Sequence, residues 1–406
     1  MLKHVLFIFM LLLTKQVGAQ EAEKLTGRVI DAKTKQPISA VHIEYQKSGV
    51  STITNSEGEF LIAKADESDY LVFTHISYVS RKVSSQEVFF DIVMEESAVF
   101  LPEATVVSVP VDTIVKNVWD KYYAIYKANE KEKRNKKNHT FFYRQVTQTD
   151  TIYNEFIEGF FLGKSTYGVS DLELAKGRSA SVKITEEEFA LSLSNFFHQS
   201  CARPFHDKNP PPNKSIVNVF LQPNASELYN ISLDRIMESN ELGNIYVFTY
   251  IPKDTIAEKY IFTGKLFVRK TDLAILRFEA ELFNMGINDN DIIKMVKVVN
   301  KIEADYKYYD LNYPIIESVK CFATIDLMHK NKMHKVKISS TLFLVEYDAG
   351  KSGKKLKQKT NLLETIMKSK FDADFWDNNP IIKRTALEDK IIEFFKNRNI
   401  IGAFQP

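Results

Sequence analysis

The residues with metal-binding and nucleophilic chemistry gather in one stretch of the chain. His198, Cys201 and His206 follow the spacing H-x2-C-x4-H and are succeeded by Pro210–Pro212. Imidazole and thiolate groups bind zinc, and a thiolate beside a histidine is an activated nucleophile. The sequence offers no fourth ligand and no acyl-transfer motif around Cys201. We therefore interpret the stretch as a loop and predict neither a zinc site nor a catalytic cysteine there.

Two other polar groups could bind ions. The run Asn288–Asp291 offers oxygen ligands of the kind that calcium prefers, but the glycine and the distal glutamate of an EF-hand loop are missing. We interpret this run as a polar turn. His329 and His334 flank a short turn at 330–333, and we expect both histidines to face solvent.

Motifs of common enzyme classes are absent from the sequence. No histidine is followed by a glutamate three positions later, and no G-x-S-x-G, Walker A or C-x-x-C pattern occurs. The acidic residues offer no recognisable frame for glycoside hydrolysis. The sequence therefore predicts no catalytic, cofactor-binding or metal-ligating residues, no cofactor, and a protein that is not an enzyme.

The composition is that of a folded protein with room for two domains. Of 406 residues, 44% are hydrophobic and 26% are charged. A net charge of +2 gives no field that would attract nucleic acid or anionic lipid, so we expect neither as a partner. Cys201 and Cys321 could form a disulfide in an oxidising compartment, and the sequence leaves open whether they meet.

The first 19 residues are typical of a cleavable export signal. A basic start precedes an apolar run from Val5 to Leu13, and Val17–Ala19 supplies a small-residue cleavage site. The apolar run has about nine residues, whereas a membrane-spanning helix needs roughly twenty. We predict a signal peptide at 1–19, a linker at 20–24, and no membrane-spanning segment after cleavage.

From Leu25 to Glu96 the chain alternates short strand-like segments with tight polar turns. β-Branched and aromatic residues recur at every second position, from the segment LTGRVID to the segment VFFDIVM. Positions such as Val41, Ile43 and Tyr45 would line the inner face of two packed sheets. We predict a seven-stranded β-sandwich over residues 25–107.

This segment resembles the carboxypeptidase-regulatory-like domain, a transthyretin-like β-sandwich. The resemblance rests on Gly27–Asp31, Thr34–Ile38, Ala40–Ile43, Thr54–Phe60 and His75–Tyr78, and Leu101–Val107 resembles the short strand that usually closes the domain. Such domains are common at the start of exported Gram-negative proteins, including TonB-dependent receptors. The resemblance implies an accessory module in the periplasm or at the outer membrane.

Three residues depart from the usual pattern of that domain, all in or beside turns. Lys35 stands where glycine is common, Asn55 where aspartate is common, and Ser77 where glycine precedes the tyrosine. Asn and Ser are good turn residues, and we expect Lys35 to adopt a right-handed turn conformation. These departures weaken an inherited ligand role more than they weaken the fold.

Residues 108–406 predict a larger curved antiparallel β domain with helices near 112–127, 186–197 and 385–397. Asp112 can cap a helix whose apolar residues recur at spacings of three and four. Thr385 with Glu388 has the pattern of a capping box. The fold class is therefore mainly β, a transthyretin-like sandwich followed by a curved β domain with a few helices.

Strand-like segments follow Thr140 at 141–144, 153–161, 245–251, 260–268, 274–283, 296–308, 315–328 and 334–347. The segments 261–268 and 274–283 predict a hairpin over a tight turn. Lys and Glu recur too often in them for the lipid-facing side of an outer-membrane barrel. Runs such as Phe142–Arg144 and Asp374–Trp376 resemble the domain that follows the regulatory-like module in many exported bacterial proteins, which implies no activity. The strand pattern is also similar to the half-barrel of periplasmic lipoprotein carriers, an analogy of fold alone.

Three functions are compatible with these patterns. The leading one is a non-catalytic exported binding or assembly module of the envelope, which contacts a protein partner through a strand edge or a sheet face. The alternative is a periplasmic carrier of an acyl or other apolar ligand, which predicts an apolar pocket beneath the 112–127 helix. The second alternative is a hydrolase with an unrecognised site, which predicts carboxylates or histidines that converge on a polar cleft.

Overall fold

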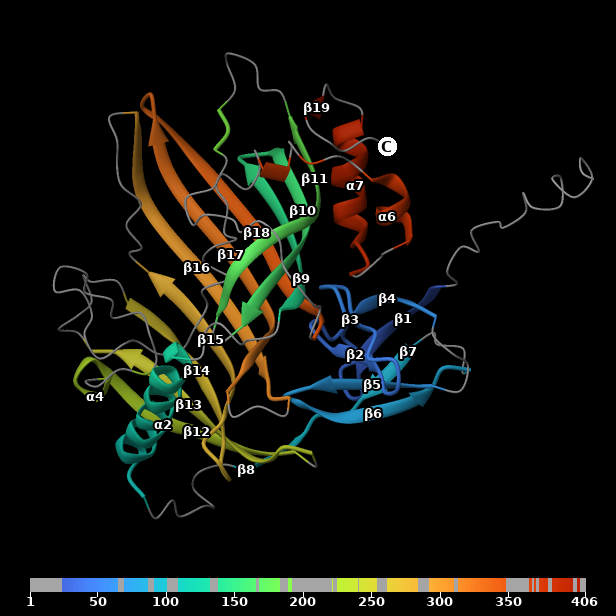
Figure 1. Cartoon of the computed structure of the whole chain (residues 1–406). Coiled ribbons are helices and arrows are strands. Elements are labelled where there is room, and N and C mark those ends of the chain that lie inside the picture. The colour runs from blue at the N-terminus through green and yellow to red at the C-terminus, as the bar shows by residue number, and fades with distance from the viewer. Residues whose placement is uncertain are drawn as a thin grey trace, which may run out of the picture.

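The computed structural model consists of an N-terminal sandwich and a large twisted sheet (Figure 1). It describes residues 24–64, 69–86, 91–100, 109–131, 138–165, 168–182, 189–191, 221, 225–239, 241–253, 261–283, 292–309, 313–347, 365–366, 369, 372–378, 382–396 and 400–401. The predicted signal peptide and the segment 101–107 lie outside the described residues. Of the predicted helix at 186–197, only 189–191 are described, and they are not helical. No described helix combines the length and the apolarity needed to cross a membrane.

The sandwich has seven strands in two sheets, as the alternation predicts. One sheet has the order β4-β1-β7 and the other has the order β3-β2-β5-β6. The strands are β1 (Lys24–Asp31), β2 (His42–Tyr45), β3 (Ser51–Ile53), β4 (Glu59–Ala63), β5 (Tyr70–His75), β6 (Tyr78–Ser84) and β7 (Asp91–Met94). Residues of alternate positions, including Ile43, Tyr45 and Phe73, are buried between the sheets. Strand β1 begins at Lys24, the last residue of the expected linker.

Two turns of the sandwich depend on special backbone conformations. Gly58 has φ 72°, and a Cβ atom there would lie 2.6 Å from the carbonyl oxygen of Val29, so only glycine fits. Lys35 has φ 58°. The expectation of a right-handed turn at Lys35 is therefore wrong, because Asp31 fixes the preceding turn by accepting the N–H groups of Lys33 and Thr34.

The second module is one 12-stranded antiparallel sheet. Its strand order is β19-β11-β10-β9-β18-β17-β16-β15-β14-β13-β12-β8. The strands are β8 (Ala98–Phe100), β9 (His139–Thr149), β10 (Ile152–Ser165), β11 (Val169–Val182), β12 (Tyr229–Ser239), β13 (Gly243–Pro252), β14 (Ile261–Arg269), β15 (Ile275–Phe283), β16 (Ile293–Lys307), β17 (Ile315–His329), β18 (Lys332–Glu346) and β19 (Ile400–Ile401). The predicted hairpin is confirmed as β14 and β15. Strand β8 lies within the range expected for the sandwich but pairs with β12 of the large sheet.

Helix α2 (Val111–Lys131) packs on one face of the large sheet at its β12 end (Figure 1), over the range where the apolar spacing predicts a helix. Ile114, Val118 and Tyr122 of α2 are buried against sheet residues such as Phe141 and Leu266. The Tyr122 hydroxyl accepts the N–H of Ile275 at 2.7 Å. The side chains beneath α2 belong to one buried cluster, and a second cluster around Ile325 and Val336 lies farther along the same face.

The opposite face carries the sandwich and the C-terminal helices α6 (Ala373–Asn378) and α7 (Ala386–Lys396). Figure 1 shows the blue sandwich beside the middle of the sheet, with both red helices above it. Phe142 and Phe160 of the sheet are buried in one cluster with Ile53 of the sandwich and Trp376 of α6. A short helix, α4 (Ala225–Leu228), precedes β12. We call the sheet face that carries the sandwich the docking face.

Candidate functional site

A row of charged side chains crosses the docking face from strand to strand. Directly opposite residues of antiparallel strands share a face, so the registers place one residue of each strand in the row. From β15 to β11 the members are Glu279, Glu303, Lys320, Thr341, Arg144, Glu158 and Arg178. We call this row the charge ladder.

One end of the ladder is a buried triad of Arg144, Glu158 and Arg178. Arg144 Nε donates to Glu158 Oε1 at 2.6 Å, and Arg178 Nε donates to Glu158 Oε2 at 2.5 Å. Burial of Glu158 opposes ionisation, but the two guanidinium groups outweigh it and lower the pKa of its carboxyl to about 2. Arg144 Nη2 also donates to the carbonyl oxygen of Ile382 at 2.9 Å. The triad thus fixes the segment that leads into α7.

The other end of the ladder is organised by Arg277 of β15, which is almost completely buried. Its guanidinium contacts Glu279 at 2.8 Å, Glu303 at 3.0 Å and Asp305 at 2.8 Å. Ser318 donates to the second oxygen of Asp305 at 2.8 Å. Burial opposes ionisation of Asp305, but Arg277 lowers the pKa of this carboxyl below its ordinary value. Asp305 is therefore a fixed anion at neutral pH.

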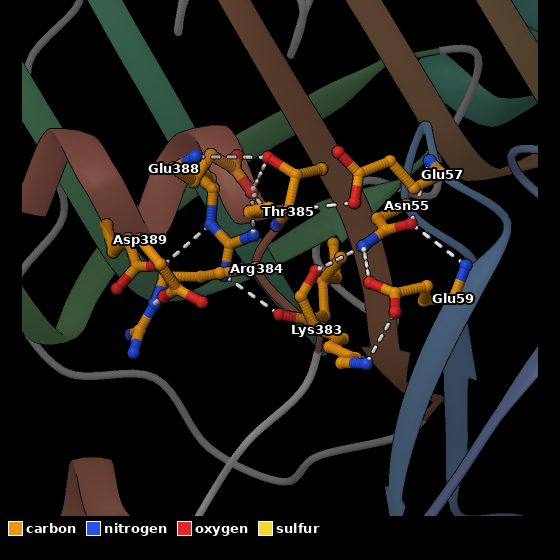
Figure 2. Close-up of polar contacts among 12 residues, drawn as sticks. Asn55, Glu57, Glu59, Lys383, Arg384, Thr385, Glu388 and Asp389 are labelled. Atoms are coloured by element: carbon orange, nitrogen blue, oxygen red, sulfur yellow. Dashed lines mark hydrogen bonds and ion pairs between the residues drawn. The ribbon is translucent and has the colours of Figure 1, made fainter.

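A polar contact, which we call the clasp, joins the sandwich turn Asn55–Glu59 to the segment Lys383–Glu388. Asn55 Oδ1 accepts the N–H groups of Glu57 and Glu59, each at 2.9 Å, which shapes the turn. Asn55 Nδ2 then donates to the carbonyl oxygen of Lys383 at 3.2 Å, and Lys383 Nζ pairs with Glu59 at 2.7 Å. Figure 2 shows these side chains pointing across the gap between the modules.

The clasp also holds the N-terminus of α7. Thr385 Oγ1 accepts the N–H of Glu388 at 3.1 Å, and Glu388 Oε2 accepts the N–H of Thr385 at 2.8 Å, which confirms the capping box. Glu57 of the sandwich accepts the N–H of Ala386 at 3.4 Å (Figure 2). A carboxylate at a helix N-terminus is electrostatically favourable. The cap of α7 is therefore shared between the two modules.

The sandwich and the docking face enclose a cavity of about 440 Å³, which we call the inter-module cleft. Strands β2, β5 and β6 supply one wall, because their outward residues face the large sheet while their inward residues form the sandwich core. The ionisable lining residues come from both modules; they are His42, Glu44, His75, Tyr78, Glu241, Arg269, Asp305, Tyr306, Lys307, Tyr308 and Glu317. Apolar side chains such as Val72, Ile76 and Leu276 complete the lining. The cleft thus combines ionisable and apolar groups and exists only when the modules are docked.

Two histidines and one glutamate in the cleft have strongly shifted pKa values. Burial, reinforced by Lys307, lowers the pKa of His42 to about 3, and burial with nearby Arg277 does the same for His75. Burial raises the pKa of Glu317 to about 7. Glu317 Oε1 lies 3.5 Å from His42 Nδ1. The cleft therefore combines neutral imidazoles with a carboxyl that is half protonated near neutral pH.

Ion pairing across the cleft joins the modules. Lys307 Nζ of β16 contacts Glu44 Oε2 of β2 at 2.6 Å, and Lys307 also lies over the ring of Tyr309 at 5.1 Å. His75 Nδ1 accepts the N–H of Ser77 at 3.2 Å, which leaves its other ring nitrogen to carry the proton. The cleft is therefore lined by both hydrogen-bond donors and hydrogen-bond acceptors.

Among the residues singled out from the sequence, several fall outside the part of the chain that the structure describes. His198, Cys201, His206 and 288–291 are outside the described residues. Cys321 is buried on β17, and its thiol contacts Asn300 Oδ1 at 2.7 Å. The described part of the chain contains no group of three or more His, Cys, Asp or Glu residues placed to hold a metal ion.

The expectation of two solvent-facing turn histidines is wrong for His334. Its side chain is buried, its Nδ1 lies 2.8 Å from Asp150 Oδ2, and its ring packs on Phe189 with centroids 4.5 Å apart. Strand β18 places alternate residues on the covered face, and His334 shares that face with Val336. His334 thus joins the β17–β18 hairpin to the β9–β10 turn.

The cleft residues were missed because they belong to no local motif. One sequence signal for the cleft wall exists: polar residues occupy every second position of a strand-like segment, as Glu303, Asp305 and Lys307 do. That pattern also describes an ordinary solvent-facing strand. Only the docked sandwich turns it into a cavity wall.

Comparison with known proteins supports the first module. Residues 25–106 match the model of the CarboxypepD_reg-like domain, which confirms the resemblance derived from the sequence. This domain is a regulatory, non-catalytic one. No curated protein matches the chain.

Two solved structures show distant similarity. One is a type II cohesin–X-dockerin complex from Acetivibrio cellulolyticus, at 20% identity over 18% of this chain and 51% of that chain, with a TM-score of 0.14. The match thus spans about half of that chain. The other is a putative membrane-associated protein of unknown function from Bacteroides fragilis, at 11% identity over 80% of this chain and 97% of that chain, also with a TM-score of 0.14. The chain thus carries a CarboxypepD_reg-like domain at residues 25–106, followed by a larger β-sheet module.

Proposed function

We propose that the protein is an exported, non-catalytic binding protein of the bacterial envelope that holds a small polar ligand in the inter-module cleft. The observation that carries the proposal is the pairing of His42 with Glu317 inside a cavity of about 440 Å³. Burying an imidazole and a carboxyl group costs free energy, and apolar side chains would fill the same space without that cost. Cavities of this size with a few convergent polar groups are typical of small-molecule sites.

The regulatory-like module supports a role in the periplasm or at the outer membrane, where such modules accompany larger proteins. In this proposal the sandwich is one wall of the ligand site, and the large sheet is the other. The ligand would be polar and would offer both hydrogen-bond donors and acceptors, because the cleft offers neutral imidazoles beside fixed charges such as Asp305.

The test compares two Glu→Gln variants on the same sheet face. Native mass spectrometry of the full protein, purified from the envelope of the cells that make it, should detect a co-purified small molecule in the wild type. Glu317→Gln should lose it, whereas Glu281→Gln, which removes a carboxylate paired with Lys301 outside the cleft, should retain it. A wild type without an adduct, or an adduct retained by Glu317→Gln, contradicts the proposal. A stoichiometric protein in place of a small molecule would favour the assembly role.

A hydrolase is the second candidate, because histidines and carboxylates converge on the inter-module cleft. The states of His42 and Glu317 suit a general base and a general acid. However, neither His42 nor His75 hydrogen-bonds a hydroxyl group among the described residues, so the structure lacks a built nucleophile–base pair there. Conversion of the co-purified molecule by wild type, and not by His42→Asn, would favour this candidate.

A further inference from the structure

The charge ladder has a gap at its centre, where Lys320 of β17 stands between Glu303 and Thr341. Glu303 is held by Arg277 at 3.0 Å, and the neighbour on the other side, Thr341, is uncharged. Within the described residues, the Lys320 ammonium group has no hydrogen-bond or ion-pair partner. The Thr341 hydroxyl likewise has no such partner within that part of the chain. Every other cation of the ladder is paired with a carboxylate.

A second cavity, of about 320 Å³, lies over this gap, and we call it the clasp cavity. On one side the cavity is lined by the sandwich turn at Thr54–Ser56 and by residues within Ile382–Glu388, the stretch that contains the clasp segment. On the sheet side it is lined by Lys320 and Thr341. Ile53 lines both cavities and stands between them. The clasp cavity is thus separate from the inter-module cleft that carries the proposed function.

The charges around the clasp cavity do not balance. Its two carboxylates are already engaged, Glu303 by Arg277 and Glu388 by the N–H of Thr385 at 2.8 Å. Arg144 is satisfied by Glu158. Lys301 pairs with Glu281, so among the described residues Lys320 is the lining cation without a direct ion pair. Burial lowers the pKa of its amine to about 8, although the nearby Glu303 and Asp305 carboxylates oppose this shift.

We propose that the clasp cavity binds the carboxylate of a small organic acid, with the Lys320 ammonium and the Thr341 hydroxyl as donors to its oxygens. A bound carboxylate would give Lys320 a direct ion pair, such as Arg144 and Arg178 of the ladder make with Glu158. Ile53, Phe322 and Ile382 would contact the carbon skeleton of the acid. This apolar lining favours an organic acid over inorganic phosphate, which would leave those side chains uncovered.

The test measures binding to the full-length protein by isothermal titration calorimetry at pH 7. The probes are butyrate, benzoate and succinate, with butyramide as the neutral counterpart of butyrate and inorganic phosphate as the competing oxyanion. We expect at least one acid to bind and butyramide not to bind. Lys320→Met should weaken binding at least about tenfold, whereas Lys297→Met, the same change on an exposed residue of β16 outside the cavity, should leave it unchanged.

Three results would overturn the proposal. They are equal binding of the acids by wild type and Lys320→Met, no acid binding tighter than about 10 mM, and binding of phosphate alone. If Lys320→Met fails to fold, amine acetylation with peptide mapping on the wild type decides the question. A bound acid should protect Lys320 and leave Lys297 fully reactive, and equal labelling of Lys320 with and without acid overturns the proposal. None of these outcomes depends on a ligand in the inter-module cleft.

Discussion

Replacing Asn55 by aspartate tests how the clasp holds the modules together. The carboxylate keeps the Oδ1 acceptor for the turn but loses the Nδ2 donor to the carbonyl oxygen of Lys383 at 3.2 Å and to Glu59 at 3.3 Å. Aspartate is also the residue common at this position in the similar domain, so it fits the turn. Any loss of stability would therefore come from the contact between the modules.

The magnitude follows from these two contacts. Each lost hydrogen bond costs about 0.5–1.5 kcal/mol. The new carboxylate would lie near Glu59, and two like charges at 3.3 Å repel by about 1–2.5 kcal/mol in a dielectric of about 40–80. Lys383 beside Glu59 offsets part of this repulsion. We expect Asn55→Asp to lower the free energy of unfolding by about 3 kcal/mol at pH 7.

The assay is urea denaturation, with hydrogen exchange of the amides at 386–389 as a local readout of the clasp. Adding Glu59→Gln to Asn55→Asp removes the repulsion and should restore at least about 1 kcal/mol. The deficit should shrink as pH falls below about 4, where the new aspartate is protonated. A variant within about 0.5 kcal/mol of wild type, or a deficit that Glu59→Gln leaves unchanged, would refute this account of the clasp.

Three further variants test other parts of the structure. Lys35→Gly should raise the free energy of unfolding by about 0.5–1 kcal/mol, because φ 58° is strained for lysine, and a lower urea midpoint would contradict this. Glu158→Gln should cost about 3–5 kcal/mol, since it leaves two buried guanidinium groups without their anion, and the exposed Asp389→Asn serves as the control in the same assay. Glu317 has a raised folded-state pKa, so wild type loses stability as pH rises from about 4.5 to 7. Glu317→Gln should remove that loss and be more stable than wild type by about 2–3 kcal/mol at pH 8 but not at pH 4.5, and equal shifts at both pH values would disprove it.

The sequence predicts strands well where one face is buried in a continuous core. The segments that became β9, β10 and β13–β18 were identified because apolar residues alternate along them. β11 and β12 were missed, because Lys176, Gly177 and Arg178 interrupt one and Asp234 with Arg235 interrupt the other. These polar residues are satisfied by cross-strand partners such as Glu158 and Lys265, which a single strand does not reveal.

The candidate sites were harder to predict than the fold for a physical reason. His42 and Glu317 are far apart in the chain; His42 is an outward residue of β2, and Glu317 lies where the register between β16 and β17 shifts. Their burial, and hence their shifted pKa values, arise only when two separately formed sheets dock. The helix pattern predicts a core-facing helix, and Trp119 and Tyr122 of α2 are indeed buried in the core cluster.

The clasp also constrains the order in which the protein can assemble. The turn at Asn55–Glu59 is synthesised more than 300 residues before the segment Lys383–Glu388, which it contacts. The sandwich draws its core from residues 29–94 and can form early. Its docking must wait for the C-terminal segment, as pairing of β9 with β18 must wait for β18. The two cavities would therefore appear only after both modules have formed, and a nascent chain would pass through a stage in which the sandwich is folded but unattached.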